Sequence, residues 1–196
     1  TANWGAQGPG GDRFYAFDKK TGEPVWSSTP ANRPLDSCFS YPYIGWKDGK
    51  RVLYATMGDG SVVGLNARTG DPLWRITIGK AGINASILVQ NDEKIIAIYG
   101  TPYEPGQMVA LKIPKVTPTN NAGPMVIERA AAQLWANDLS TSTSSPILVG
   151  NRVYVVSEKG DLCSVDVETG KILWRLKIGI EQRNASPIFA DGKIYV

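Results

Sequence analysis

The chain has 196 residues, a formal net charge of +3 and a hydrophobic content of 42%. This length is sufficient to bury a sizeable core. Lysine and arginine are scattered rather than clustered, which argues against nucleic-acid binding and against a membrane-surface patch. Histidine is absent, so the commonest transition-metal ligand and the commonest general base are both missing. No stretch approaches the length of a transmembrane helix, and we expect no membrane insertion.

The two cysteines do not form a recognisable site. Cys38 lies in an expected loop and Cys163 in an expected strand, and they match neither a Cys-x-x-Cys motif nor a metal-ligand spacing. We interpret them as an incidental thiol and a small buried residue. A disulfide between them is the alternative that the sequence leaves open.

An eleven-residue pattern occurs three times, at residues 16–26, 64–74 and 164–174. Thr-Gly occupies the sixth and seventh positions of each copy and tryptophan the eleventh. Apolar and polar residues alternate on both sides of the turn, which predicts a β-hairpin. The turn glycines, which we expect in the left-handed conformation, are Gly22, Gly70 and Gly170.

The tryptophans of the pattern predict a stacked arrangement. A tryptophan has roughly 150–250 Å² of surface to bury, which an isolated hairpin cannot do. We therefore expect each indole to pack against the neighbouring repeat. The structural tryptophans are Trp26, Trp74, Trp135 and Trp174.

In chain order, the alternating segments predict an all-β protein with about 40 residues and four antiparallel strands per unit, the size of one propeller blade. The expected units are a half blade at 12–29, a blade at 42–79, a blade at 84–138 with an insertion at 114–132, a blade at 144–179 and a half blade at 184–196. The third unit begins the pattern at Ala110 but lacks Thr-Gly before Trp135. We expect its proline- and asparagine-containing insertion to project as a loop.

The two half blades allow two interpretations. They could pair and close a four-bladed ring, or the chain could belong to a larger ring. Unpaired sheet edges at both ends would favour aggregation unless something covers them. We favour the larger ring, because the chain stops at Tyr195 and Val196 without turn or capping residues.

The pattern Ala/Ser/Gly-x-Asp/Asn-x-x-Thr-Gly-x-x-x-Trp resembles the tryptophan-docking motif of the pyrroloquinoline-quinone (PQQ)-like propeller repeat family. The copy at 16–26 has the family's Ala and Asp at the first and third positions. In the other copies Gly64 and Ser164 replace the Ala, and Asn66 replaces the Asp. The family includes quinoprotein alcohol and sugar dehydrogenases and BamB-type lipoproteins of outer-membrane protein assembly. Its rings usually have seven or eight blades. The resemblance therefore implies about half a ring and a periplasmic or extracellular location.

Two functions are consistent with this resemblance. The first is a non-catalytic binding or scaffold module that requires no cofactor, no catalytic residue and no metal. Its partner would be a protein or a small polar ligand, together with the remaining blades or a second copy. The alternative is part of a PQQ-dependent alcohol or sugar dehydrogenase with PQQ and calcium. The adjacent Cys-Cys pair of such enzymes is missing, and no Asp or Glu stands in a recognisable calcium loop.

One recurrence points to a ligand site. Asn-Ala-Ser precedes a first strand at 84–86 and again at 184–186. In this family the first strand is the innermost, so these residues are expected at one rim of the central channel. The candidates for holding a polar or anionic ligand are Asn84, Ser86, Arg183, Asn184 and Ser186. The alternative is that Asn and Ser satisfy local backbone groups at the strand start.

Overall fold

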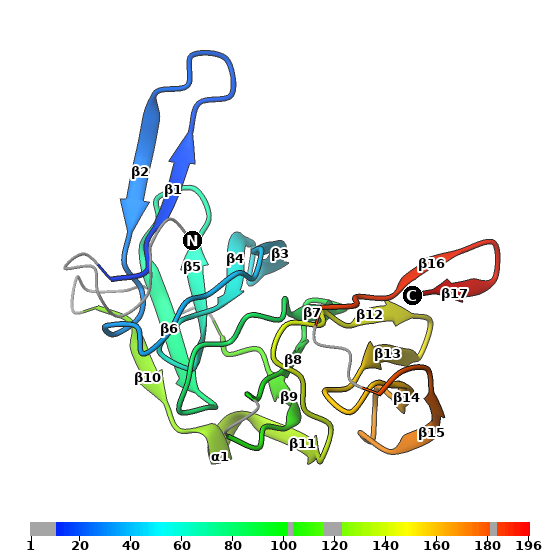
Figure 1. The fold of residues 1–196 in the computed structure, drawn as a ribbon. Helices are drawn as coiled ribbons and strands as arrows, with labels where there is room; N and C mark the ends of the chain where they lie inside the picture. Colours follow the sequence, from blue (N-terminus) through cyan, green and yellow to red (C-terminus); the bar gives the residue numbers. More distant parts are fainter. Residues whose placement is uncertain (1–10, 102–103, 116–122, 181–183) are drawn as a thin grey trace.

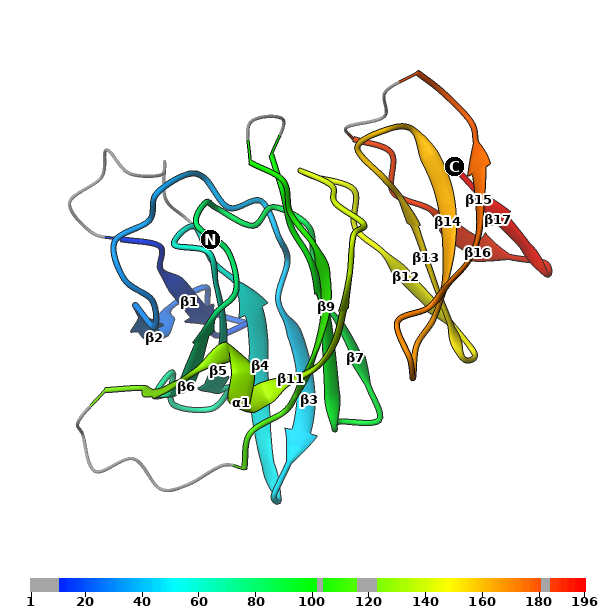
Figure 2. The same ribbon diagram turned by 90° about the horizontal axis from the view of Figure 1, so that it is seen from below.

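The structure, a computed structural model, describes residues 11–101, 104–115, 123–180 and 184–196. Within these residues it contains strands and a single helix of four residues, α1 (Arg129–Ala132). The sheets follow one another in chain order and stand side by side (Figures 1 and 2). The prediction of an all-β partial propeller is confirmed.

Three larger sheets, here called blades A, B and C, lie between two hairpins. The hairpins pair β1 (Phe14–Phe17) with β2 (Pro24–Ser28), and β16 (Ile188–Ala190) with β17 (Lys193–Tyr195). Blade A contains β3 (Tyr43–Lys47), β4 (Lys50–Thr56), β5 (Ser61–Asn66) and β6 (Pro72–Thr77). Blade B contains β7 (Leu88–Gln90), β8 (Lys94–Ile98), β9 (Met108–Lys112) and β11 (Gln133–Asn137). Blade C contains β12 (Ile147–Val149), β13 (Arg152–Val156), β14 (Asp161–Asp166) and β15 (Ile172–Lys177).

The first strands of neighbouring sheets contact each other, β3 with β7 and β12 with β16. Three of these first strands begin at Leu88, Ile147 and Ile188, a few residues after the expected starts of their units at 84, 144 and 184. The residues before them bond to the adjacent sheet instead of to their own strand partners, as described below.

The repeated turns form as predicted. The Asp18 carboxylate accepts hydrogen bonds from the backbone N–H groups of Lys20 and Thr21, at 2.8 and 3.0 Å. Asp166 accepts the corresponding bond from Thr169 at 2.8 Å. The three turn glycines have φ values of +76°, +79° and +72°, at Gly22, Gly70 and Gly170. Glycine is favoured there because it adopts a positive φ without steric cost.

Two tryptophans lie directly on the glycine turn of the next sheet. A Cβ added to Gly70 would lie 2.7 Å from Cε3 of Trp26, and one added to Gly170 would lie 2.5 Å from Cδ2 of Trp135. The indole Nε1 of Trp135 also donates to the carbonyl of Val167 at 3.1 Å. The glycines therefore leave the room that the indole rings occupy.

The other two tryptophans have different surroundings. Trp74 is fully buried, although the following sheet lacks the Thr-Gly turn. Its ring lies against Gly64 and beside Tyr54, with ring centroids 5.9 Å apart. Its Nε1 has no hydrogen-bond partner among the described residues. Trp174 lies beside Tyr154 in the same way, but is 38% exposed.

Apolar side chains fill the space between successive sheets. One cluster joins hairpin β1–β2 to blade A through Phe14 and Leu65. A second joins blade A to blade B through Trp74 and Leu111, and a third joins blade B to blade C through Trp135. The core is thus divided among the junctions, as expected where each repeat buries its neighbour's face.

The insertion does more than lengthen a loop, contrary to expectation. Its segment β10 (Met125–Ile127) pairs in parallel with β6, the outer strand of blade A, with Met125 opposite Trp74 and Ile127 opposite Ile76. The chain then forms α1 and returns to blade B as β11. Pairing with β10 gives hydrogen-bond partners to backbone groups of β6 that would otherwise lie at a sheet edge.

We predict that Gly170→Ala destabilises the protein by about 2–4 kcal/mol, the sum of a positive φ and overpacking against Trp135. Gly22 has a similar φ, but nothing lies within 4 Å of an added Cβ. Gly22→Ala should therefore cost only about 1 kcal/mol. Urea unfolding of both variants measures the difference, and equal losses would show that the indole contact contributes nothing.

A second prediction isolates the indole hydrogen bond. Trp135→Phe removes ring volume and the bond to Val167, whereas Trp74→Phe removes ring volume and an N–H without a partner among the described residues. We expect Trp135→Phe to cost about 1 kcal/mol more than Trp74→Phe in urea unfolding. A smaller loss for Trp135→Phe would contradict the assignment.

Candidate functional site

The predicted rim residues mediate contacts between sheets. The side-chain oxygen of Asn84 accepts a hydrogen bond from the backbone N–H of Phe39 at 3.1 Å. Asn184 likewise accepts from the hydroxyl of Thr143 at 2.8 Å. Arg183 lies outside the described residues.

The serines form a relay of bonds from sheet to sheet. Ser86 Oγ accepts from the backbone N–H of Tyr41 at 3.1 Å, and the N–H of Ser86 donates to Ser145 Oγ at 3.0 Å. The N–H of Ser145 then donates to Ser186 Oγ at 3.0 Å. A ligand at these side chains would compete with bonds that connect the sheets, so we turn to other parts of the molecule.

Both cysteines are free thiols, so the alternative of a disulfide is wrong. Cys38 Sγ lies 3.2 Å from the carbonyl of Thr56 and 3.1 Å from that of Ile83, and donates to them. Burial raises the pKa of the Cys38 thiol, and it raises that of Cys163 to about 11. A raised pKa disfavours the reactive thiolate, so neither side chain is suited to nucleophilic chemistry at neutral pH.

Two carboxylates lie close to the β4–β5 turn of blade A. Asp12 is 1% exposed and accepts a bond from the N–H of Gly58 at 2.6 Å, while its other oxygen has no partner among the described residues. Burial, with a smaller effect of the Asp59 charge, raises the pKa of Asp12. Asp59 itself accepts bonds from the N–H and hydroxyl of Ser61 and from the N–H of Asn32. These bonds join the carboxylates to the backbone of neighbouring loops, so we assign both side chains a structural role rather than ligand binding.

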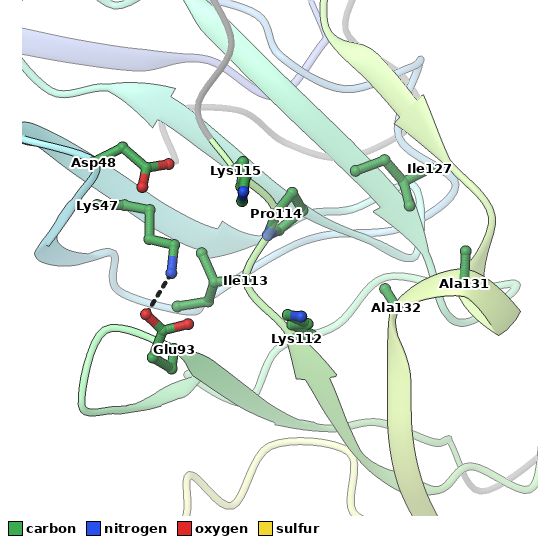
Figure 3. Close-up of a pocket in the computed structure, with 10 residues that line it drawn as sticks. All are labelled: Lys47, Asp48, Glu93, Lys112, Ile113, Pro114, Lys115, Ile127, Ala131 and Ala132. Atoms are coloured by element: carbon green, nitrogen blue, oxygen red, sulfur yellow. Dashed lines mark ion pairs between the residues drawn. The ribbon is translucent and has the colours of Figure 1, made fainter.

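A cleft opens where blade B lacks the Thr-Gly turn. It lies between blades A and B, beside the insertion, and has a volume of about 350 Å³. We call it the insertion cleft (Figure 3). Its lining residues are Lys47, Asp48, Glu93, Lys112, Ile113, Pro114, Lys115, Ile127, Ala131 and Ala132. This volume falls within the usual range of small-molecule sites, about 300–1,000 Å³.

Different elements supply the two kinds of lining. The end of β9 and the residues after it contribute Ile113 and Pro114, β10 contributes Ile127, and α1 contributes alanines. Charged side chains come from the end of β3 and the β7–β8 turn, where Lys47 and Glu93 form an ion pair at 2.7 Å, and from β9 and the segment after it, which contribute Lys112 and Lys115. The cleft thus combines an apolar wall with charged groups.

Arg129 fixes the position of α1. Its guanidinium donates to the carbonyl of Ile78 at 3.0 Å, to the hydroxyl of Tyr99 at 2.9 Å and to the side chain of Gln107 at 2.6 Å. These acceptors lie next to the ends of β6 in blade A and of β8 and β9 in blade B, so one side chain connects the insertion to both blades. Sequence reasoning missed this residue and the cleft beside it.

The fold and the repeated turn define a β-propeller built from PQQ-like repeats. A family model described as "Outer membrane protein assembly factor BamB" matches residues 6–112 and 125–196. The chain belongs to this family. The unmatched residues between these ranges are 113–124, and all of them except Ile113 fall inside the insertion. No curated protein matches the chain.

Solved structures show the same fold. BamB from Moraxella catarrhalis is similar over 98% of this chain and 50% of its own, with a TM-score of 0.62 and 18% identity. The computationally designed Ika8 protein matches 91% of this chain and 47% of its own, with a TM-score of 0.55 and 13% identity. The designed Ika4 protein matches 81% of this chain and 85% of its own, with a TM-score of 0.53 and 12% identity. The chain thus spans about half the length of the BamB and Ika8 chains.

The described residues contain neither a cluster of acidic or cysteine side chains nor an adjacent cysteine pair. Among residues 11–101, 104–115, 123–180 and 184–196, no three Cys, Asp or Glu side chains gather closely enough to hold a metal ion. Cys38 lies in a loop packed on blade A and Cys163 on β14 of blade C, so they do not form an adjacent pair. In the same part of the chain, no helix has the length and hydropathy needed to cross a membrane.

The raised pKa of Asp12 predicts a pH-dependent stability. A raised pKa in the folded state favours folding when the group is protonated, and this stabilisation is lost as pH rises through the folded-state pKa. We therefore expect Asp12→Asn to be more stable than the unsubstituted protein at pH 7, with the difference shrinking toward pH 4. Urea unfolding midpoints at several pH values measure this.

Asp18→Asn is a control with the opposite sign. Backbone N–H groups of Lys20 and Thr21 lower the pKa of Asp18, so its contribution is present at neutral pH and lost on acidification. This variant should be less stable than the unsubstituted protein at pH 7, with the difference shrinking at low pH. A loss of stability in Asp12→Asn at pH 7 would contradict the assignment for Asp12.

Proposed function

We propose that this protein is a non-catalytic binding or scaffold module that works outside the cytoplasm and needs no cofactor. The observation that carries the proposal is the insertion cleft, a site of ligand-binding size that lies at the junction where the repeat departs from its own pattern. Family membership supports the binding role, since the family model carries the description of an outer-membrane protein assembly factor.

The exposed apolar side chains on and beside β15 of blade C support a further blade as a binding partner. On β15, Trp174 is 38% exposed, Leu176 56% and Ile178, just after the strand, 40%. Trp135 occupies the corresponding position in blade B and is buried by the turn at Gly170. We infer that Trp174 is a docking residue for a blade that presents a Thr-Gly turn, from the remainder of the same protein or from a second copy.

The alternative function is part of a PQQ-dependent alcohol or sugar dehydrogenase. The described residues contain no cluster of three or more acidic or cysteine side chains, and this favours the binding module over the dehydrogenase. Because this chain spans half the length of the BamB chain that it matches, the decisive test uses the full gene product.

The experiment incubates that full product with PQQ, Ca²⁺, a panel of alcohols and sugars, and an artificial electron acceptor. We expect no dye reduction, and we expect cell fractionation to recover the protein outside the cytoplasm. A purified quinoprotein dehydrogenase is the positive control for reconstitution. Substrate-dependent dye reduction that requires PQQ would overturn the proposal in favour of the dehydrogenase.

A further inference from the structure

We propose that the insertion cleft binds a small amphipathic carboxylate, with the carboxylate held by Lys112 and Lys115. This inference rests on the proposed binding function and names the ligand class of the same site. Three of the lining residues, Ile113, Pro114 and Lys115, lie outside the ranges that the family model matches, whereas Lys112 lies inside them.

Charge is the first support. Lys47 is 8% exposed, and its ammonium group is already neutralised by Glu93. Lys112 and Lys115 are exposed and have no ion pair or side-chain hydrogen bond among the described residues. Both line the cleft together with Asp48, so the lining carries three lysines and two carboxylates, an excess of one positive charge that favours an anion (Figure 3).

The second support is the apolar wall. Ile113 is 1% exposed and Ala132 4% exposed, and Ile127 packs against the same cluster. Together with Pro114 and Ala131 they line the cleft, with Ile113 toward Lys47 and Glu93 and the alanines on the side of α1 (Figure 3). Ile113 and Ala132 are already buried, so the apolar surface open to a ligand comes from Pro114, Ile127 and Ala131. A ligand with a hydrocarbon body would bury this surface, whereas a fully hydrated anion would not. An amphipathic anion is therefore the class that uses both parts.

The third support is that the walls are held in place. Arg129 connects α1 to both blades, and the Lys47–Glu93 pair connects the end of β3 in blade A to the β7–β8 turn of blade B. A pre-formed cleft avoids the ordering cost that a mobile site would add to binding.

The test compares hexanoate, 1-hexanol and acetate by isothermal titration calorimetry at low ionic strength. Hexanoate has both the charge and the hydrocarbon body, hexanol lacks the charge, and acetate lacks most of the body. We expect hexanoate to bind with one-to-one stoichiometry and both other ligands to bind at least about ten-fold more weakly.

The variant Lys112→Gln/Lys115→Gln should weaken hexanoate binding by about ten-fold and leave hexanol binding unchanged. The control is Lys19→Gln/Lys20→Gln in the β1–β2 turn, which removes the same charge from exposed positions on a hairpin that projects away from the cleft (Figure 1). It should bind hexanoate like the unsubstituted protein. Circular dichroism confirms that both variants fold.

Three results would overturn the inference: no hexanoate binding at millimolar concentration, equal weakening in both double variants, or equal binding of hexanoate and acetate. The proposed function fails differently, by PQQ-dependent dye reduction in the assay above. A protein that binds no hexanoate and shows no dye reduction therefore contradicts this inference alone.

Discussion

The contact between a tryptophan and the glycine turn of the next sheet is the constraint on which most of the structure depends. Gly170 must adopt a positive φ to close its hairpin, and it must also lack a side chain because the ring of Trp135 lies against it. One residue thus serves the local turn and the contact between sheets. Since a lone hairpin cannot bury an indole, the contact also sets the order in which sheets stack.

The junction between blades A and B shows what happens without that contact. Blade B has no glycine turn to receive Trp74, and the insertion supplies other neighbours. Trp74 shares a buried cluster with Ile113 and Ala132, and β10 pairs with β6 beside it. The apolar requirement is met, but the hydrogen bond that Trp135 makes to a backbone carbonyl has no counterpart among the described residues. The insertion restores burial and at the same time encloses the cleft.

Much of the fold could be predicted from the sequence, because hairpins and turns depend on residues close together in the chain. Alternation and Thr-Gly spacing predicted each of the repeated turns. The parallel pairing of Met125 with Trp74 could not be predicted in this way, since it joins residues far apart and the short β10 carries little periodic signal. Arg129 was missed because its role depends on acceptors in three separate segments. The sequence showed the serines of the relay only as a repeated Asn-Ala-Ser segment, and their bonding partners could not be predicted because the bonds run between sheets.

The two kinds of junction differ in what holds them. Blades B and C share the Trp135 contact, the Ser86–Ser145 bond and a Lys94–Glu168 ion pair at 2.8 Å. Blades A and B have the corresponding inner bond, Tyr41 to Ser86, and an ion pair at a different position, between Lys47 at the end of β3 and Glu93 in the β7–β8 turn. The junctions differ most at the place of the missing turn, where Arg129 and α1 substitute for the turn that carries Gly170 and Glu168 in blade C. Because the flanking contacts remain, the cleft can exist without loosening the junction, and a ligand that enters it need not move either blade.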